Sequence, residues 1–388
     1  MNALGSSGFR LILLSPHNPE NVRAWSGTVH FAFRALRKLD PSIEAVSAGP
    51  LDRIVALSQK VSRKLGLIGD FRHTRAFATL ASLIASLSLR FKNADAIVAI
   101  AASTHVYALR TRLPVVYVSD ATFAAIVASY QEFAQFPKWL REEGDAVERS
   151  ALARSSAIVY PSDWAKDSAV KDYGVSPEKI AVMPLGPNFD REAIDRFRTR
   201  KSADFGSGVR LLFVGMEWVR KGGPIALEVM QILVSRGIRC ELVVVGKAPE
   251  EAQKHEGVRF VGPLNKNDHG QLAALCEIYE RAHFLVLPTR QEAFGVVFSE
   301  AQAFGCPSLS YAVGGAATAV KDGVTGFALP LEASASDFAD RIFSLVHDPR
   351  RYEEMSANCR ARYEQEANWD VWAAKVMELA RAARNAPV

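Results

Sequence analysis

The chain has 388 residues, of which 49% are hydrophobic, 23% charged and 9% aromatic. This composition excludes a disordered or collagen-like chain, and the length favours two to three domains, of which we take two as the working number. The formal net charge is +5, but residues 1–115 carry 15 Lys and Arg against 6 Asp and Glu. The basic excess at this end suits nucleic acid, an anionic membrane surface or an acidic small molecule, and it equally fits a solvated surface rich in arginine.

The first half of the chain alternates short apolar, β-rich runs with longer amphipathic segments. The predicted strands are residues 9–15, 96–102, 114–120, 157–162 and 180–186. Continuous apolar runs of this kind are typical of parallel strands that helices cover on both faces. The most apolar helix candidate, "AFATLASLIASLSLRF" at 76–91, falls short of the roughly 20 apolar residues that span a bilayer. The apolar run near the N-terminus is too short for a signal peptide. We therefore expect a cytoplasmic protein, with contact to the inner membrane that is at most peripheral.

The same pattern starts again after a polar stretch near residues 187–206. The predicted strands of the second set are residues 209–215, 240–246, 258–262, 282–288, 307–311 and 326–330. Two consecutive α/β sets predict two Rossmann-like, doubly wound domains that face each other across a cleft. The tail 368–386 has the periodicity of a helix, with Trp372, Val376 and Leu379 on its buried face.

Cysteines and histidines offer no metal or disulfide framework. The four cysteines lie in the second half without a CxxC pair, and no His cluster has metal-ligand spacing. They are Cys240, Cys276, Cys306 and Cys359. His17, His73 and His105 lie near predicted strand ends or a basic helix, and we interpret each as a structural histidine with its hydrogen bonds satisfied.

The segment "RQEAFGVVFSEAQAFGCP", residues 290–307, carries two glutamates eight positions apart, Glu292 and Glu300. It follows a predicted strand, and its helix begins near Gly295, at the edge where open parallel sheets bind ligands. The backbone N–H groups of the first turn suit an anion such as a diphosphate, and Gly295 allows the anion to approach closely. This turn comprises Phe294, Gly295, Val296 and Val297. Carboxylates accept hydrogen bonds from sugar hydroxyls. The segment predicts one glutamate for each of two sugars that flank a diphosphate.

Two surface carboxylates near a helix N-terminus are the alternative interpretation of this pair. Each would stabilise the helix by about 0.3 to 1 kcal/mol through the interaction of its charge with the helix dipole. The surrounding sequence favours the binding interpretation.

The segment "PTRQEAFGVVFSEAQAFGCPSLSYAVGGAATAVKDGVTGFALP" resembles the nucleotide-sugar signature of retaining glycosyltransferases of the GT-B fold, family 4 (glycosyl transferases group 1). "RLLFVGMEWVRKGG" is similar to the same family's strand, glycine and basic KG turn. The resemblance implies an acceptor-binding domain at 1–195, a nucleotide-sugar-binding domain at 196–367 and a C-terminal helix, 368–388, packed on the first domain.

The resemblance also implies roles for individual residues. Glu292 would hold donor-sugar hydroxyls, Glu300 the ribose, and the amides of residues 294–297 the sugar and diphosphate. Lys221, with help from Arg220, would neutralise the diphosphate. Gly215, at the end of the preceding strand, would belong to the same donor site. A cation there is physically apt because negative charge grows on the leaving group as the glycosidic bond breaks.

Two positions depart from the family pattern, and others beside the glycine loops have a second interpretation. Met216 stands where many relatives carry a phosphate-clamping arginine. Asp120 stands where many have a histidine, and we expect it to line the reaction site. Gly27 belongs to a loop that would approach the donor phosphates, while Ser26 could instead be a helix N-cap. Trp25 and Trp218, beside the two glycine loops, are candidate sugar platforms.

The function expected is transfer of a hexosyl group from a UDP- or GDP-sugar to an acceptor hydroxyl, with retention and without a metal ion or other cofactor. Polysaccharide or glycolipid biosynthesis would supply a saccharide or lipid-linked acceptor. The alternatives are a non-catalytic nucleotide-sugar-binding protein and a GT-B epimerase. Nucleic-acid binding is disfavoured, because the basic residues are dispersed and lack interleaved aromatics.

Overall fold

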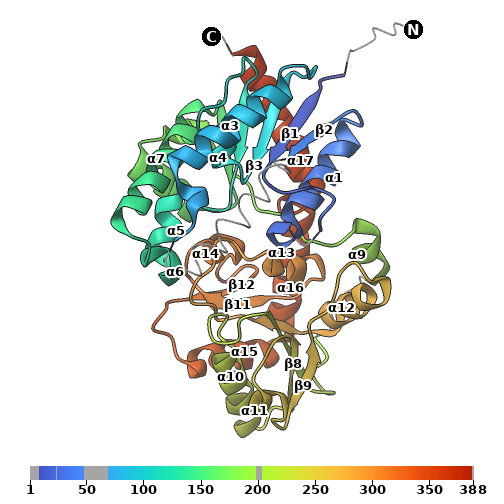
Figure 1. The fold of residues 1–388 in the computed structure, drawn as a ribbon. Coiled ribbons are helices and arrows are strands. Elements are labelled where there is room, and N and C mark those ends of the chain that lie inside the picture. The colour runs from blue at the N-terminus through green and yellow to red at the C-terminus, as the bar shows by residue number, and fades with distance from the viewer. Residues whose placement is uncertain (1–7, 23, 48–68, 198–202, 387–388) are drawn as a thin grey trace, which may run out of the picture. The chain divides into compact units, whose positions relative to one another are not determined.

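The computed structural model describes residues 8–22, 24–47, 69–197 and 203–386, and part of the expected linker, residues 198–202, lies outside these ranges. The chain forms two compact units (Figure 1). One runs to Met183 and includes the last helix, α17 (Trp369–Asn385), and the other spans Pro184–Asn368. The limit expected at 195/196 falls inside a helix of the second unit, α9 (Arg191–Phe197).

The first unit is built on a six-stranded sheet in the order β2-β1-β3-β4-β5-β6, in which every pair is parallel. Its strands are β1 (Leu11–Ser15), β2 (Glu44–Ser47), β3 (Ala96–Ile100), β4 (Val115–Val118), β5 (Ala157–Tyr160) and β6 (Ile180–Val182). The residues of β1, β3, β4 and β5 are all buried, as expected for strands covered on both faces.

Eight α-helices of the first unit are described. They are α1 (Thr28–Leu39), α3 (Arg75–Leu89), α4 (Ser103–Val106), α5 (Phe123–Ser129), α6 (Gln131–Ala134), α7 (Lys138–Arg154), α8 (Asp163–Tyr173) and α17. Figure 1 shows α17, in red, beside the blue elements of this unit, and it packs against α1, β3, β4 and β5. Trp372 and Val376 lie on its buried face as expected, whereas Leu379 is only partly buried.

The second unit has a parallel six-stranded sheet in the order β12-β11-β10-β7-β8-β9. Its strands are β7 (Val209–Gly215), β8 (Cys240–Gly246), β9 (Val258–Gly262), β10 (Phe284–Val286), β11 (Ser308–Tyr311) and β12 (Gly326–Leu329). Its remaining helices are α10 (Gly223–Ser235), α11 (Glu250–Gln253), α12 (His269–Arg281), α13 (Val296–Ala303), α14 (Ala316–Ala319), α15 (Ala335–Val346) and α16 (Pro349–Gln365).

The predicted α/β architecture of two doubly wound units is confirmed, and each predicted apolar run contains a strand. Sequence patterning missed β2, whose residues "EAVS" are mostly exposed because it is a short edge strand and carries no continuous apolar run. Among the described helices, none is both long and apolar enough to cross a bilayer.

Candidate functional site

The strand order of the second unit changes direction between β7 and β10. Counted within this unit, the order is that of the doubly wound dinucleotide-binding fold, which binds ligands outside the carboxyl ends of the strands at this change of direction. The loop after β7 carries Lys221, and the loop after β10 carries Glu292. Topology therefore brings the two predicted motifs to one place.

Backbone contacts fasten these two loops together. The amide of Arg290 donates to the carbonyl of Arg220 at 3.0 Å, and the Arg220 guanidinium donates to the carbonyl of Gln291 at 2.9 Å. Gly222 has a φ of 82°, and a Cβ there would lie 2.1 Å from the carbonyl oxygen of Pro288. Only glycine permits this approach.

Lys221 and Glu292, both predicted for the donor site, form an ion pair between Nζ and Oε2. Their side chains are only 17% and 11% exposed. Gly215 leaves the space in which Lys221 packs, because a Cβ on this glycine would meet the lysine Cγ at 3.1 Å. A carboxylate and a cation are thus held together at the sheet edge, and each retains hydrogen-bonding capacity for a ligand.

The helix α13 begins beside this pair. Gly295 is its N-cap with a φ of 83°, and Val296 and Val297 are its first residues, while Phe294 is buried. The N–H groups at the start of a helix lack partners from a preceding turn, so such a turn can bind an anion. A Cβ on Gly295 would meet the Phe298 ring at 2.6 Å, which explains why glycine stands there.

Glu300 is buried, with an exposed fraction of 1%, which excludes the surface-charge alternative for this residue. Its Oε2 accepts a hydrogen bond of 2.8 Å from the Tyr279 hydroxyl, and its Oε1 pairs with the ammonium of Lys266. Burial, and then the Glu300 charge, raises the pKa of Tyr279 well above its ordinary value. The ammonium also lies 4.7 Å from the centre of the Phe189 ring. Hydroxyls of a ligand would reach this carboxylate beside Lys266, which is one-third exposed.

The Arg220 side chain forms hydrogen bonds within the loops of the candidate site. Its Nε donates to Glu217 at 2.9 Å, and this hydrogen bond, more than any other cause, lowers the pKa of the glutamate. Met216 is exposed, and Trp218 packs edge-on against Phe213 with ring centres 5.0 Å apart, so this tryptophan fills the loop core.

Sequence reasoning missed four residues here. Lys266 follows β9, and its signal was its place after the carboxyl end of a strand; Tyr279 gave no signal within α12. Gly314 and Gly315 pass closely over the Glu292 loop, because a Cβ on Gly315 would lie 1.9 Å from the carbonyl of Ala293. The amide of Gly315 donates to the carbonyl of Glu292 at 2.9 Å.

Gly27 and Asp120 belong to the first unit. Trp25, Ser26 and Gly27 have φ values of 48°, 56° and 88°, three consecutive left-handed residues in the 3-10 helix Ala24–Gly27. Gly27, not Ser26, is the N-cap of α1, so the cap interpretation of Ser26 is wrong. Asp120 comes two residues after the end of β4, at the carboxyl edge of the sheet, and is partly buried.

The histidines near this edge have different surroundings. His73 lies among Phe123, Phe133 and Phe136, and burial lowers its pKa to about 4, as expected for a structural residue. His105 is buried, with Nδ1 3.1 Å from the Thr104 hydroxyl. Its Nε2 has no hydrogen-bond partner among the described residues, so the expectation of a fully satisfied histidine is wrong there.

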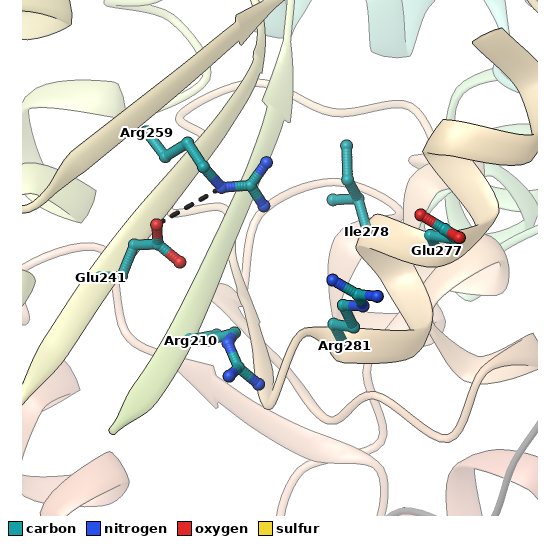
Figure 2. A pocket seen from close by; sticks show the side chains of 6 residues that line it. All are labelled: Arg210, Glu241, Arg259, Glu277, Ile278 and Arg281. Atoms are coloured by element: carbon teal, nitrogen blue, oxygen red, sulfur yellow. Dashed lines mark ion pairs between the residues drawn. The ribbon is translucent and has the colours of Figure 1, made fainter. Parts of the chain in front are cut away.

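A separate pocket of about 330 Å³ lies at the amino-terminal ends of β7, β8 and β9 (Figure 2). Three arginines line it with two glutamates, and Arg259 pairs with Glu241 at 3.3 Å. The loops that hold Lys221 and Glu292 follow the opposite ends of the strands. This pocket is therefore not part of the candidate site.

Two doubly wound units, each with a parallel six-stranded sheet, define the GT-B class of α/β proteins, and comparison with known families agrees. A model of the glycosyl transferases group 1 matches residues 196–362, and a model of glycosyltransferase family 4 matches residues 66–191. The chain belongs to this family of glycosyltransferases.

Curated relatives include D-inositol 3-phosphate glycosyltransferases. The one from Actinosynnema mirum is 29% identical over 231 residues, which cover 54% of this chain and 54% of the relative. The one from Streptomyces scabiei is 31% identical over 235 residues, covering 55% of this chain and 51% of the relative. The matched region thus spans about half the length of these relatives.

Solved structures share the fold over nearly the whole chain. A sucrose-phosphate synthase from Thermosynechococcus elongatus has a TM-score of 0.65 at 18% identity, covering 96% of this chain and 98% of that one. Anabaena HepE in complex with UDP and glucose has a TM-score of 0.62 at 15% identity, covering 96% and 100%.

Proposed function

We propose that this chain is a retaining hexosyltransferase that moves a sugar from a UDP- or GDP-sugar to an acceptor hydroxyl. The observation that carries the proposal is the ion pair of Lys221 with Glu292, two residues 71 positions apart, beside the first turn of α13. A cation, a carboxylate and helix N–H groups in one place fit a diphosphate joined to a polyol. The HepE structure, which contains UDP and glucose, supports a nucleotide donor for this fold.

The diphosphate would bind on the cationic side of the pair. Lys221 exchanges its contact with Glu292 for a phosphate oxygen, and the α13 amides from Phe294 to Val297 donate to the diphosphate and sugar. Arg220 has a supporting role, because its guanidinium is held by Glu217 and by the carbonyl of Gln291. Preorganised donors of this kind stabilise the charge that develops on a leaving diphosphate.

The two glutamates would hold the sugars. Glu292, once released by Lys221, accepts from hydroxyls of the donor sugar. Glu300 accepts from the ribose at the edge of its contact with Lys266, using the lone pairs that Lys266 and Tyr279 leave available. In the first unit, we assign Gly27 to the approach to the phosphates and Asp120 to the acceptor.

In the proposed reaction, the bond between the anomeric carbon and the diphosphate oxygen breaks. The acceptor oxygen forms its bond to the same carbon on the same face, and its proton passes to an oxygen of the leaving diphosphate. Lys221 and the helix N-terminus neutralise that leaving group, so the proposal includes no metal ion or other cofactor. The acceptor we propose is a saccharide or a lipid-linked saccharide of polysaccharide or glycolipid synthesis in the cytoplasm.

The test is a thermal-shift panel with UDP, GDP, ADP and their common sugar conjugates, on the native chain and on Lys221→Ala and Glu300→Ala. A ligand that binds only the folded chain raises the midpoint, by about 2.7 kcal/mol of stability at a hundred times its dissociation constant. We expect one nucleotide series to raise the native midpoint and to lose this effect in both variants. Lys254→Ala, which removes an exposed pair with Glu250, is the matched control and should keep the shift.

Turnover separates the alternatives. Transfer to a saccharide acceptor, with the anomeric configuration of the product read by NMR and activity retained in EDTA, supports the proposal. Nucleotide-sugar binding without turnover favours the non-catalytic alternative, and conversion of the donor without an acceptor favours an epimerase. A folded native chain that no nucleotide shifts contradicts the donor assignment.

A further inference from the structure

The outward face of α3 carries a stripe of large apolar side chains. Leu80, Leu83, Leu87 and Phe91 are 39%, 51%, 57% and 88% exposed. Their spacing of three or four residues puts them on one side of the helix, and Phe91 lies just past its end. They are four of the twelve exposed large apolar side chains in the described part of the chain. Scattered apolar residues are ordinary on a surface, whereas a stripe of this kind marks an interaction site.

The other face of α3 already supplies the core of the unit. Phe77, Ala78, Ala81 and Ala85 are buried there, and the helix packs against α4 and α7. The exposed leucines are therefore not needed to hold the helix in place.

A pocket of about 1030 Å³ adjoins the stripe and is lined by Leu83 and Leu87 together with five cationic residues. The cationic residues are Arg90, Lys92, Arg110, Arg112 and Arg154, and the lining includes no carboxylate. They come from the end of α3, the segments before β3 and β4, and the end of α7. This is the amino-terminal edge of the sheet, opposite the edge where Asp120 lies.

The positive charge of this edge is only partly compensated. Lys92 pairs with Glu44, and the Arg154 guanidinium donates to the carbonyl of Leu109 at 3.4 Å. Among the described residues, the side chains of Arg110 and Arg112 have no carboxylate partner. An occupant that offers many negative charges and an apolar interior would satisfy both the stripe and the arginines.

We propose that the α3 surface, defined as the four stripe residues and the five cationic residues, docks on an anionic lipid bilayer. Leucine and phenylalanine side chains enter the acyl boundary, while arginine and lysine contact lipid phosphates. A second copy of the chain is disfavoured, because a two-fold contact would bring the cationic residues of the two copies together. The α3 surface belongs to the first unit and the donor-site residues Lys221 and Glu292 to the second, and the proposal does not depend on the proposed reaction.

The experiment is co-sedimentation of the full chain with phosphatidylcholine vesicles, with and without phosphatidylglycerol. We expect binding only to the vesicles that contain phosphatidylglycerol, weaker at high salt, because exposed charges are screened. Leu83→Ser with Leu87→Ser, and separately Arg110→Glu with Arg112→Glu, should each lower the partition coefficient at least tenfold. Val324→Ser with Leu331→Ser, and Arg350→Glu with Arg351→Glu, change exposed residues of the second unit and should leave it unchanged.

Insertion has its own readout. Brominated phosphatidylglycerol in the vesicles should quench the tryptophan fluorescence of a Phe91→Trp variant. The fluorescence of a Leu331→Trp variant should be quenched no more than that of the native chain. Equal unfolding midpoints of all variants show that lost binding is not lost folding. Binding that the α3 variants leave unchanged, or no binding to anionic vesicles, overturns the proposal. So does a dimer that Leu83→Ser with Leu87→Ser dissociates, or salt-sensitive retention on DNA that exceeds vesicle binding.

Discussion

Glu300 combines a predicted binding role with a structural one. The carboxylate is buried and holds two donors from other elements, Tyr279 of α12 and Lys266 of the loop after β9. A buried carboxylate is tolerated only with such partners. Loss of ligand binding in a Glu300 variant could then arise from a displaced loop, so the neighbours of Glu300 have to be tested separately.

We predict that Tyr279→Phe lowers the free energy of unfolding by about 1.5 to 3 kcal/mol, because its hydroxyl donates to a charged acceptor. Urea denaturation measures this loss. Tyr311→Phe is the control: its hydroxyl donates to the neutral carbonyl of Ala333 at 2.9 Å and should contribute about 1 kcal/mol. Equal losses in the two variants would show that the hydrogen bond of Tyr279 is no stronger than that of Tyr311.

Glu148 of α7 is a second buried carboxyl, in the first unit. The Tyr117 hydroxyl lies 3.4 Å and 3.5 Å from its oxygens, and burial raises its pKa from 4.5 to about 8. Between these values the folded chain keeps a proton that the unfolded chain has released. The contribution of Glu148 to the free energy of unfolding is therefore fully present below pH 4.5. It falls as the pH rises from 4.5 to about 8 and levels off above that.

We expect Glu148→Gln, which keeps the shape and removes the titration, to flatten this part of the stability profile. The difference in the free energy of unfolding between the variant and the native chain should shift in favour of the variant by a few kcal/mol between pH 5 and pH 8, since one pKa unit corresponds to about 1.4 kcal/mol. Urea midpoints across the range measure it. Glu142→Gln, which changes an exposed partner of Lys138, should leave the slope as it is, and parallel profiles for all three chains would contradict the prediction.

At the scale of elements, the site depends on two loops that come from strands adjacent in the sheet but far apart in sequence. The turn at Gly222 lies against the backbone at Pro288, and the amide of Arg290 donates to the carbonyl of Arg220. These contacts, more than the side-chain pair itself, fix the distance between Lys221 and Glu292. Backbone shape at Gly222 is therefore predicted to control ligand affinity.

Gly222→Ala should be strongly destabilising. Gly237 has the same φ of 82°, but a Cβ there would have no atom of the described residues within 4 Å, so Gly237→Ala isolates the backbone strain, about 1 to 2 kcal/mol. The steric conflict with Pro288 should add about 1 to 3 kcal/mol more in Gly222→Ala. Calorimetric titration with the nucleotide that binds should show weaker affinity only in Gly222→Ala. Similar losses in stability and affinity for both variants would rule out the close approach.

At the scale of the whole molecule, the last helix completes the unit that the chain began with. Trp372 of α17 is fully buried, and the helix contacts β3, β4 and β5 of the first unit. The helix therefore contributes to the stability of the first sheet, although more than 180 residues of the second unit separate it from β6 in sequence.

We predict that Trp372→Ala lowers the free energy of unfolding of the first unit by about 3 to 5 kcal/mol. Glu378→Ala, on the exposed side of the same helix, should change it by no more than about 0.5 kcal/mol. Hydrogen exchange resolved by segment measures each unit, and the amides of β7 and β8 should keep their native protection in both variants. Loss of protection throughout the chain would mean that the units unfold as one.

Much of the fold follows from local pattern. Apolar runs such as those in β1 and β3 have few alternatives to buried strands, because their side chains are apolar on both faces. The edge strand β2 was not predicted, because it lacks such a run. Around the site, the positions of Lys221, Glu292 and Gly295 in loops after strands were predictable, because glycine, charge and strand ends are visible in sequence. The position of Tyr279 was not predictable, because a single tyrosine within a helix carries no such signal. Lys266 also follows a strand, but nothing in the sequence indicates that it pairs with Glu300.

The sequence by itself determined the two α/β units, the strand ends that carry the motifs and the family to which they belong. Only the tertiary structure decided which groups meet: Lys221 with Glu292, Glu300 with Tyr279 and Lys266, and the leucines of α3 with the arginines before β4. The physical reason is that hydrophobic periodicity and turn chemistry act over a few residues, whereas strand order brings together groups that are dozens of positions apart.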